Sequence, residues 1–509
     1  MKKLSLFLLT LTFSISLVSC TSNNSTTDSS QTSSSAEETL TENKLSSFGL
    51  SDTTKYYGST FAENEISDIY IEISDADWQP ILDNPTSEEY HSATLTINGE
   101  TYENIGFRTK GFSSLTTVSQ SDSNRYGFRI KMDKYVDGQT LNGLDDFVLN
   151  ASFSDASYMR EYLTYSAISH LNGITPFVNY TNLYINGELF GFYLSIEAYD
   201  DSFVQRNTTG NDVCLYKADS ENCILTSSDD ASGFDLKYGD DEKLDHVKNL
   251  ISVLNNTTSD NKEDLEKILD IDSVLKAIAV NTVLGNYDSY SGSKAHNYYL
   301  LYEDGKFSYL GWDYNMSIGG FNEDNGASVT VDISSPFYNV DSSTRPLMEK
   351  LLEIDEYYNT YLSYVNDLCD YFSNAESMIN EIKDIISTNI ENDPSAFYTI
   401  EQFTTATSIS DSDLSQVVAS IGNQPQNENM QLPEGMSAPT DMMPPELSEA
   451  PTDGNMASMT PPQDIENFEN MQMPANVGNM GGIINNESCS ILDYITQRIE
   501  NIKTQLTES

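Results

Sequence analysis

A tyrosine-rich stretch in the second half of the chain constrains the fold more than any other segment. Two runs, residues 297–303 and 306–310, have the composition of β-strands, and Asp304-Gly305 between them is a strong signal for a tight hairpin turn. The open end of such a hairpin brings the residues before its first strand close to those after its second strand. Polar residues at these positions are therefore expected at one edge of a sheet.

Three polar side chains occupy these positions. Asp288 precedes the predicted hairpin, Asn297 begins it and Asp313 follows it. An Asp base, an Asn metal ligand and an Asp metal ligand occur in this order in the phosphoryl-transfer sites of protein kinases. Asp and Asn are also common in ordinary loops, so this second interpretation stays open for these residues taken alone.

The N-terminus has the pattern of an export signal. Two lysines precede an apolar run over residues 4–18, which is too short to span a bilayer. The run ends in Leu-Val-Ser-Cys20, which resembles a bacterial lipobox and implies a lipoprotein signal peptide over residues 1–20 with a lipid on the sulfur of Cys20. An ordinary signal peptide that happens to contain a Cys is the alternative. Residues 21–60 are rich in Ser and Thr and predict a disordered tether. We therefore expect an extracytoplasmic protein on the cell surface that meets the membrane through its lipid anchor only.

The charge of the chain limits its partners. It contains 26 basic and 78 acidic residues, for a net charge of −52. Such a surface repels phosphate backbones, so nucleic-acid binding is disfavoured. A nucleotide could bind only where the few basic residues gather, so their positions carry information.

Four cysteines follow Cys20 in the sequence. An exported protein can form disulfides, here Cys214 with Cys223 and Cys369 with Cys489, or it can keep buried thiols. Both alternatives stay open. The spacing of the four cysteines does not resemble a zinc site.

Strand and helix signals are partly segregated along the chain. Alternating or β-rich segments, with turn signals between them, predict strands within residues 65–111, 126–132 and 183–196, and a helix over 158–170 lies among them. Helical spacing dominates 241–284 and returns over 346–390. The order predicts an α+β fold with two unequal lobes, a β-rich N-terminal part and a helical C-terminal part.

A segment of different composition interrupts the C-terminal part. Residues 424–485 are rich in Met, Pro and Asn, and we predict a disordered insertion there. Residues 486–509 are amphipathic again. We therefore expect one folded domain over residues 61–423 that is completed by a C-terminal helix over 486–509.

Basic residues gather at two places in the N-terminal part. Arg108 and Lys110 end a predicted strand and are followed by a glycine and by Ser113 and Ser114. Cations, backbone N–H groups and hydroxyls can together cradle an anion. The alternative is a strand-to-loop turn with solvated charges.

The next predicted strand carries Arg129 and Lys131 on one face, and Glu161 follows on the predicted helix. A strand Lys and a helix Glu form the ion pair that positions the α- and β-phosphates in protein kinases. Each of these residues, taken separately, is also compatible with a solvated surface charge.

Four separated segments, in this order, resemble the spore-coat CotH kinase family: ENIGFRTKGFSS, YGFRIKMD, LYINGELFGFYLSIEAYDDSF and HNYYLLYEDGKFSYLGWDYN. The resemblance covers roughly residues 67–320 and, more loosely, the C-terminal helices. It implies an atypical protein-kinase-like two-lobed fold. It also implies an enzyme that phosphorylates proteins on Ser or Thr with ATP and a divalent metal, Mg²⁺ or Mn²⁺.

The resemblance implies roles for the residues that match the family. Asp288 would be the catalytic residue that orients the acceptor hydroxyl and takes its proton, and Asn297 and Asp313 would bind metal. Lys131 would contact the phosphates and pair with Glu161.

Further residues would bind ATP. Arg108, Lys110, Ser113 and Ser114 would cradle the phosphates, and Glu197 would lie near the hinge between the lobes and the adenine or ribose.

Two positions depart from the family pattern. Phe112 replaces the Asn of the usual KGNSS loop, which removes a polar contact. Asn315 replaces the second Asp of the usual WDxD motif, which weakens a second metal site.

Two other functions stay open. A non-catalytic surface binding or adhesion protein could use the same scaffold, because fold does not fix function. Autophosphorylation, with acceptors in the tether or within residues 404–415, is an alternative to phosphorylation of an unidentified protein substrate.

Overall fold

The computed structural model describes residues 57, 60–61, 66–219, 223–321, 326–410, 412–416 and 489–508. All of them belong to one compact unit, residues 43–509. The predicted signal peptide with Cys20 and the insertion predicted over 424–485 lie outside the described residues, as does most of the predicted tether. Within the described part, no helix is long and apolar enough to cross a membrane.

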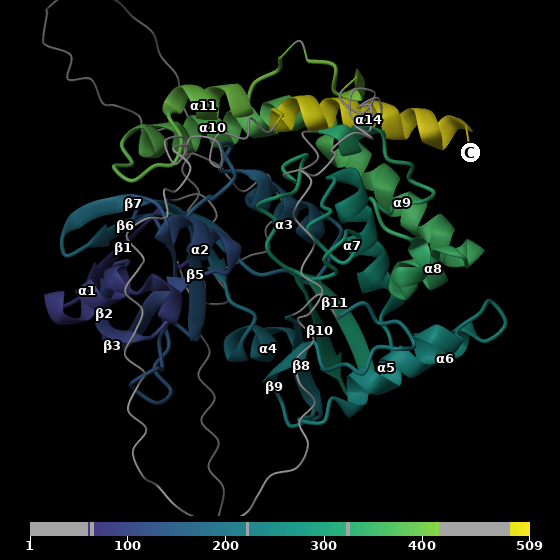
Figure 1. The fold of residues 1–509 in the computed structure, drawn as a ribbon, viewed down its shortest axis with the longest axis horizontal. Coiled ribbons are helices and arrows are strands. Elements are labelled where there is room, and N and C mark those ends of the chain that lie inside the picture. The colour runs from purple at the N-terminus through teal and green to yellow at the C-terminus, as the bar shows by residue number, and fades with distance from the viewer. Residues whose placement is uncertain are drawn as a thin grey trace, which may run out of the picture. The chain divides into compact units, whose positions relative to one another are not determined.

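The N-terminal half of the unit is a closed barrel of seven strands (Figure 1). Neighbouring strands are antiparallel except for the closing pair, in which β1 runs parallel to β6 with Ile69 opposite Leu183. In spatial order the strands are β1 (Ser67–Glu72), β2 (His91–Ile97), β3 (Glu100–Lys110), β4 (Gly127–Lys131), β5 (Asp146–Asn150), β7 (Glu188–Glu197) and β6 (Val178–Ile185).

Apolar side chains at every second position of the strands fill the barrel, as the alternating sequence predicts. Along β4, Phe128 and Ile130 are fully buried, whereas Arg129 and Lys131 point the other way and remain partly exposed. Because successive side chains of a strand point to opposite faces, one face packs the core and the other carries charge. Charged residues of this strand are therefore available at the outer surface of the barrel.

Four short elements accompany the barrel strands: α1 (Asp75–Asp83), the 3₁₀ helix η2 (Pro85–Ser87), α2 (Ser113–Ser119) and α3 (Arg160–His170). The helix predicted over residues 158–170 is confirmed as α3. It is buried over most of its length and packs against β6, α7 and α9. A buried helix that contacts both halves of the fold fixes the side chains that it projects between them.

A four-stranded antiparallel sheet forms the second half, with the strand order β11-β10-β8-β9. The predicted hairpin is confirmed: Asp304 and Gly305 both have positive φ, 46° and 100°, as a tight turn of this type requires. The strands are β8 (Val213–Ala218), β9 (Phe234–Tyr238), β10 (Tyr298–Glu303) and β11 (Lys306–Gly311).

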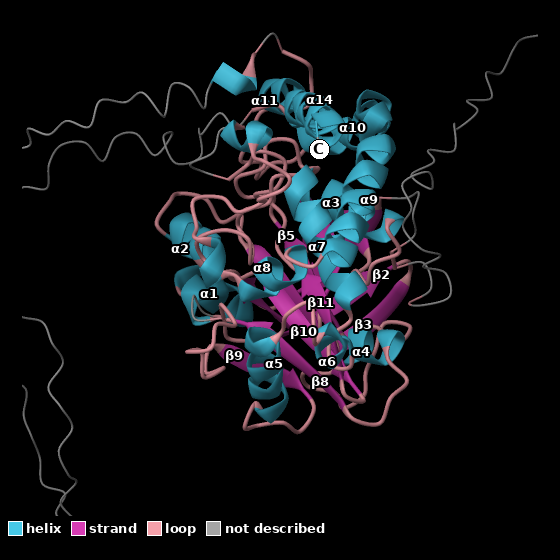
Figure 2. Cartoon of the chain, turned by 90° about the vertical axis from the view of Figure 1, so that its right-hand side faces the viewer, coloured by secondary structure: helices cyan, strands magenta, loops and turns pink. Residues whose placement is uncertain are grey.

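Helices cover this sheet, and Figure 2 shows α7 lying against its strands. The α+β class is therefore confirmed, with the barrel in the N-terminal part and most helices in the C-terminal part. The helices are α4 (Asp201–Asn207), α5 (Asp245–Asn256), α6 (Lys262–Glu266), α7 (Ile271–Val283), α8 (Pro346–Leu352), α9 (Asp355–Tyr371), α10 (Ala375–Glu391), α11 (Ile400–Ala406) and α14 (Ile491–Glu508), with the 3₁₀ helices η3 (Ala327–Thr330), η4 (Ser342–Thr344) and η5 (Phe372–Asn374).

The structure answers whether the two disulfides considered from the sequence are formed. Cys214 and Cys369 are both buried free thiols. Neither of the two disulfides considered from the sequence, Cys214 with Cys223 and Cys369 with Cys489, is therefore formed in the described part of the chain.

Arg498 joins α14 to the rest of the domain. Its guanidinium is fully buried and donates to the backbone carbonyls of Thr282, Val329 and Val331 at 2.7–3.2 Å. A buried guanidinium stabilises a fold only while its N–H groups are hydrogen-bonded to acceptors. The helix predicted at the C-terminus is thus tied to α7 and to the segment around η3.

We expect Arg498→Met to lower the free energy of unfolding by about 3 kcal/mol or more, because the buried carbonyls of Thr282 and Val329 lose their donor. Urea unfolding followed by circular dichroism measures this change. Lys503→Met, at an exposed position of the same helix, is the matched control and should change stability by less than about 0.5 kcal/mol. Equal effects of the two substitutions would contradict the role given to Arg498.

Candidate active site

The open end of the β10–β11 hairpin forms the centre of the site. Asn297 directly precedes β10 and Asp313 lies two residues beyond β11, and the Trp312 backbone N–H donates to the Asn297 carbonyl at 2.9 Å. Asn297 and Asp313 both have left-handed backbone conformations, with φ of 58° and 60°. Asn and Asp tolerate this conformation better than other non-glycine residues, and such positions cluster at functional sites.

Asp288 lies beside Asn297, as the sequence predicts. The Asn297 Nδ2 atom donates to the Asp288 carbonyl at 2.9 Å and to its Oδ2 atom at 3.1 Å. The Nε2 atom of His296 lies 2.9 Å from the other carboxylate oxygen, Oδ1. The Asp288 carboxylate is therefore held in a fixed orientation by two neighbouring residues.

His296 was not among the predicted site residues. Its position directly before Asn297 is the only sequence signal for it, and a histidine at such a position is more often structural. The structure shows that it contacts the predicted catalytic carboxylate directly.

Glu161 reaches the site from α3. Its side chain is buried, and its Oε2 atom accepts a hydrogen bond from Asn150 Nδ2 at 2.6 Å, whereas Oε1 has no hydrogen-bond partner in the described structure. Burial and the charge of Asp313 raise the pKa of Glu161 to about 7, although Lys110 and Asn150 act in the opposite direction. The interaction with Asp313 shows that the two carboxylates are close enough to repel each other.

Asp313 is the second crowded carboxylate. Burial raises its pKa first, and the negative charge of Asp288 raises it further. The positive charges of Lys110, His296 and Lys217 oppose this shift. The pKa of Asp313 stays raised in spite of these basic groups, as does that of Glu161, and a bound cation would favour the ionised form of both carboxylates.

Lys110, and not Lys131, is the lysine whose charge lowers the pKa of Glu161. The predicted Lys131–Glu161 pair is wrong, because the Lys131 ammonium lies 3.1 Å from Asp200 and 3.5 Å from Asp146, and no ion pair joins it to Glu161 among the described residues. The register explains the error: Lys110 pairs with Gly127 and Lys131 with Gly106, so the two lysines lie at opposite ends of the β3–β4 ladder.

The charges around Lys131 form a separate network at the outer surface of the barrel. Arg129 binds Asp146 with two hydrogen bonds of 2.8 and 2.9 Å and also reaches Asp200 at 3.2 Å. Burial raises the pKa of Asp146 to about 7, Arg129 lowers it, and Asp200 raises it. This network joins β4 and β5 to the segment that begins α4, which gives Arg129 and Lys131 a structural role.

Two further residues that were predicted to contact the nucleotide, Arg108 and Glu197, bind other residues of the chain. Arg108 pairs with Glu88 and stacks over Tyr90, with its guanidinium carbon 4.9 Å from the ring centre. Glu197 is fully buried and accepts hydrogen bonds from Tyr57 at 2.6 Å, from the Phe177 N–H at 3.0 Å and from Arg206 at 2.5 Å. Both side chains are thus engaged within the fold, and their predicted contacts with a nucleotide stay predictions.

The predicted phosphate loop has a definite geometry. Gly111 has a φ of 128°, and a Cβ atom there would lie 2.9 Å from the Ser114 hydroxyl, so this position requires glycine. Ser113 and Ser114 begin α2 immediately after the loop. Phe112, which departs from the family pattern, is 91% exposed. The loop therefore follows Lys110 directly but presents an aromatic ring to solvent where an Asn was expected.

Asn315, the second residue that departs from the family pattern, uses part of its side-chain amide in a hydrogen bond within the fold. Its Nδ2 atom donates to the Phe153 carbonyl at 3.2 Å. The amide oxygen is the atom that would remain for a metal, and it carries no formal charge.

Comparison with known proteins identifies the family. A family model described as CotH kinase protein matches residues 107–426, more than half of the chain, and the protein therefore belongs to this family. The predicted resemblance is confirmed.

Among curated proteins, the chain is similar to the inner spore coat protein H of Bacillus subtilis (strain 168). The two are 27% identical over 192 residues, which cover 36% of this chain and 52% of that protein. The chain thus matches about half the length of this relative.

We expect Glu161→Gln to flatten the dependence of stability on pH. Because the pKa of Glu161 rises from 4.5 to about 7 on folding, the folded state retains a proton that the unfolded state loses. The free energy of unfolding should therefore fall as pH rises from 4.5 to 7, by about 3 kcal/mol. Urea unfolding at a series of pH values in metal-free buffer measures this change.

The matched control is Glu89→Gln, at an exposed position, which should leave the pH dependence as it is in the parent protein. A slope between pH 4.5 and 7 that survives Glu161→Gln unchanged would show that the carboxyl does not titrate as described.

Proposed function

We propose that this protein is a metal-dependent atypical protein kinase that transfers the γ-phosphoryl group of ATP to Ser or Thr residues of a protein. The observation that carries the proposal is the meeting of Asp288, Asn297 and Asp313 with Lys110 and Glu161 at one place. These side chains come from the hairpin, the barrel and α3. Family membership supports the same reaction class.

The donor set fits a hard divalent cation. Asp313, Glu161 and the amide oxygen of Asn297 offer oxygen ligands, and the Glu161 Oε1 atom is buried without a hydrogen-bond partner in the described structure. Mg²⁺ and Mn²⁺ prefer such ligands, and a bound cation would offset the repulsion between the two carboxylates. When bound together with ATP, the metal would neutralise charge that develops on the phosphates.

The residues of the chain divide the remaining work. Lys110 faces the two metal-binding carboxylates and would contact the phosphate oxygens. Asp288, held by His296 and Asn297, would accept the proton of the acceptor hydroxyl as its oxygen forms a bond to the γ-phosphorus. The bond to the β-phosphate oxygen then breaks and ADP leaves.

We extend the proposal to the architecture and the location. The barrel with α3 would correspond to the N-terminal lobe of an atypical kinase fold, and the second sheet with its helices to the other lobe. The lipobox at Cys20 supports a surface-anchored lipoprotein, and the name of the Bacillus relative places that protein in the inner spore coat. The protein substrate would then be a neighbour on an exposed surface, or the chain itself.

We expect Asp288→Asn and Asp313→Asn each to reduce phosphate transfer roughly 10²- to 10⁴-fold. Transfer from labelled ATP, with Mg²⁺ or Mn²⁺, to the chain itself or to an added acidic protein measures the rate. Asp288→Asn should leave nucleotide binding measurable by calorimetry, since Asp288 acts on the acceptor. If the parent protein neither transfers phosphate nor binds nucleotide with either metal, the proposal is wrong and a surface-binding function takes its place.

Substitutions of Lys110 and Lys131 should differ in their effect on phosphate transfer in the same assay. Lys110→Met should reduce transfer about 100-fold or more, because it removes the cation beside Glu161 and Asp313. Lys131→Met should lower thermal stability but retain most of the activity of the molecules that remain folded. Lys306→Met, at the exposed turn end of the same hairpin, is the matched surface control. Loss of activity in Lys131→Met alone would overturn the assignment of Lys110.

A further inference from the structure

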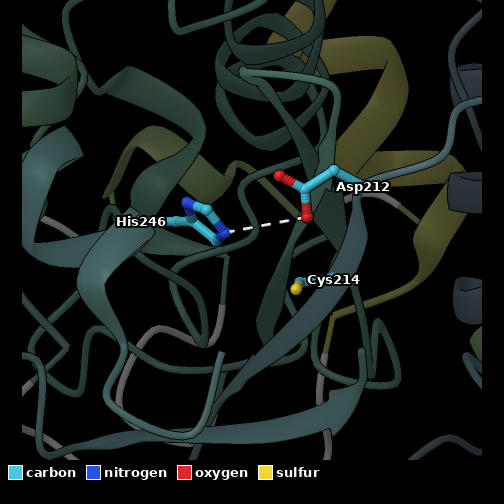
Figure 3. A group of neighbouring side chains, drawn as sticks. All are labelled: Asp212, Cys214 and His246. Carbon is cyan, nitrogen blue, oxygen red and sulfur yellow. Dashed lines mark ion pairs between the residues drawn. The ribbon is translucent and has the colours of Figure 1, made fainter. Parts of the chain in front are cut away.

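A second group of potential metal ligands lies at the start of β8, apart from the site around Asp313. Asp212 directly precedes this strand, Cys214 belongs to it, and His246 is in the first turn of α5. One donor atom from each lies within 4.8 Å of the others, and His246 Nε2 is 3.9 Å from Asp212 Oδ1. Figure 3 shows the His246 ring and the Asp212 carboxylate turned toward each other, with the Cys214 sulfur near them.

The backbone holds these ligands in place. The Asp212 N–H donates to the Asp304 carboxylate at 3.0 Å, and the Asp304 N–H donates to the Asp212 carbonyl at 2.8 Å. Cys214 is paired with Tyr302 in the β8–β10 ladder, and the His246 ring stacks on Tyr302 with ring centres 3.9 Å apart. The β10–β11 hairpin therefore contacts all three ligand residues, Asp212 through the turn residue Asp304 and the other two through Tyr302 of β10.

The chemistry of the group differs from that of the site around Asp313. A carboxylate oxygen, a thiol sulfur and an imidazole nitrogen suit Zn²⁺ and similar borderline metals, whereas Mg²⁺ and Ca²⁺ prefer oxygen alone. Cys214 is a free thiol with 2% of its surface exposed, whereas the Asp212 side chain is 60% exposed. The group is thus anchored in the core on one side and open to solvent on the other.

The spacing requires only a modest adjustment. Ligands around a tetrahedral Zn²⁺ at about 2.0–2.3 Å lie roughly 3.4 Å apart, so the present separations would close by about 1 Å. Rotation of the exposed Asp212 side chain can close its own two distances, and rotation of the partly exposed His246 side chain can close the distance to the Cys214 sulfur, without any change in the sheet.

We propose that Asp212, Cys214 and His246 bind one Zn²⁺ ion, with a fourth position open to water. The ion would join the start of β8 to the first turn of α5. Lys217, whose charge lowers the pKa of Asp313, lies three residues after Cys214 in the same strand, roughly 10 Å from it. The two metal sites would therefore be independent, and the proposal does not rest on phosphoryl transfer.

The test uses the full chain without an affinity tag, stripped of metal with a chelator and titrated with Co²⁺ as a spectroscopic probe. We expect one tight equivalent with a thiolate-to-cobalt charge-transfer band and the visible bands of tetrahedral cobalt, both removed by Zn²⁺. Zn²⁺ should also raise the melting temperature of the stripped protein. Cys214→Ser should lose the charge-transfer band and the stabilisation, whereas the matched control Cys223→Ser should keep both.

Two outcomes would overturn the site: no charge-transfer band in the parent protein, or a band that persists in Cys214→Ser. If Cys214→Ser does not fold, Asp212→Asn and His246→Gln decide the question, because each should weaken cobalt binding at least tenfold and unchanged affinity in both would exclude the site. Repeating the titration in Asp313→Asn without ATP separates this site from the proposed catalytic metal. Identical cobalt spectra in Asp313→Asn and the parent protein support the assignment, and loss of the thiolate band there would contradict it.

Discussion

The repulsion between the buried carboxylate of Glu161 and the half-buried carboxylate of Asp313 is the constraint on which the rest of the site depends. These two residues come from α3 and from the end of β11, and Lys110 comes from the barrel. Two acids at such a position cost free energy unless cations balance them. Lys110 is the basic residue that lowers the pKa of both carboxylates, and a Glu161 oxygen is left without a hydrogen-bond partner among the described residues. An assembly of this kind is costly for stability alone, and its arrangement is better explained by a ligand that brings positive charge.

The sequence predicted the local elements of this site well and their long-range partners poorly. The hairpin was predictable because strand composition and an Asp-Gly turn act within a few residues, and the placement of Asp288 beside Asn297 follows from it. For Lys131, period two correctly placed the side chain on the charged face of β4. It could not show at which end of the strand pair that residue lies, because the register with β3 and β5 depends on the whole barrel. The phosphate contact that the sequence predicted for Lys131 is therefore the one that we propose for Lys110.

Glu197 illustrates a second limit. An acidic residue at the end of a strand before a predicted lobe boundary is a reasonable candidate for a ribose contact. Its actual partners, Tyr57 and Arg206, come from a segment far before the strand and from the helix after it. Tertiary contacts also assemble the proposed Zn²⁺ site. Asp212 and Cys214 are close in sequence, but His246 joins them only through the packing of α5 beside Tyr302. Spacing along the chain contains no signal for a ligand set that tertiary contacts assemble.

The charge balance of the whole molecule narrows where a nucleotide can bind. With a net charge of −52, most of the surface repels a triphosphate, and binding requires local positive charge. Arg108 is occupied by Glu88, and Arg129 and Lys131 are occupied by the acids around Asp146 and Asp200. Lys217 pairs with Asp219 and the His296 ring contacts Asp288, whereas Lys110 forms no ion pair among the described residues. Since Lys110 lowers the pKa of both Glu161 and Asp313, the carboxylates that would hold the metal, this part of the described structure can accommodate the phosphates of a nucleotide and a divalent cation together.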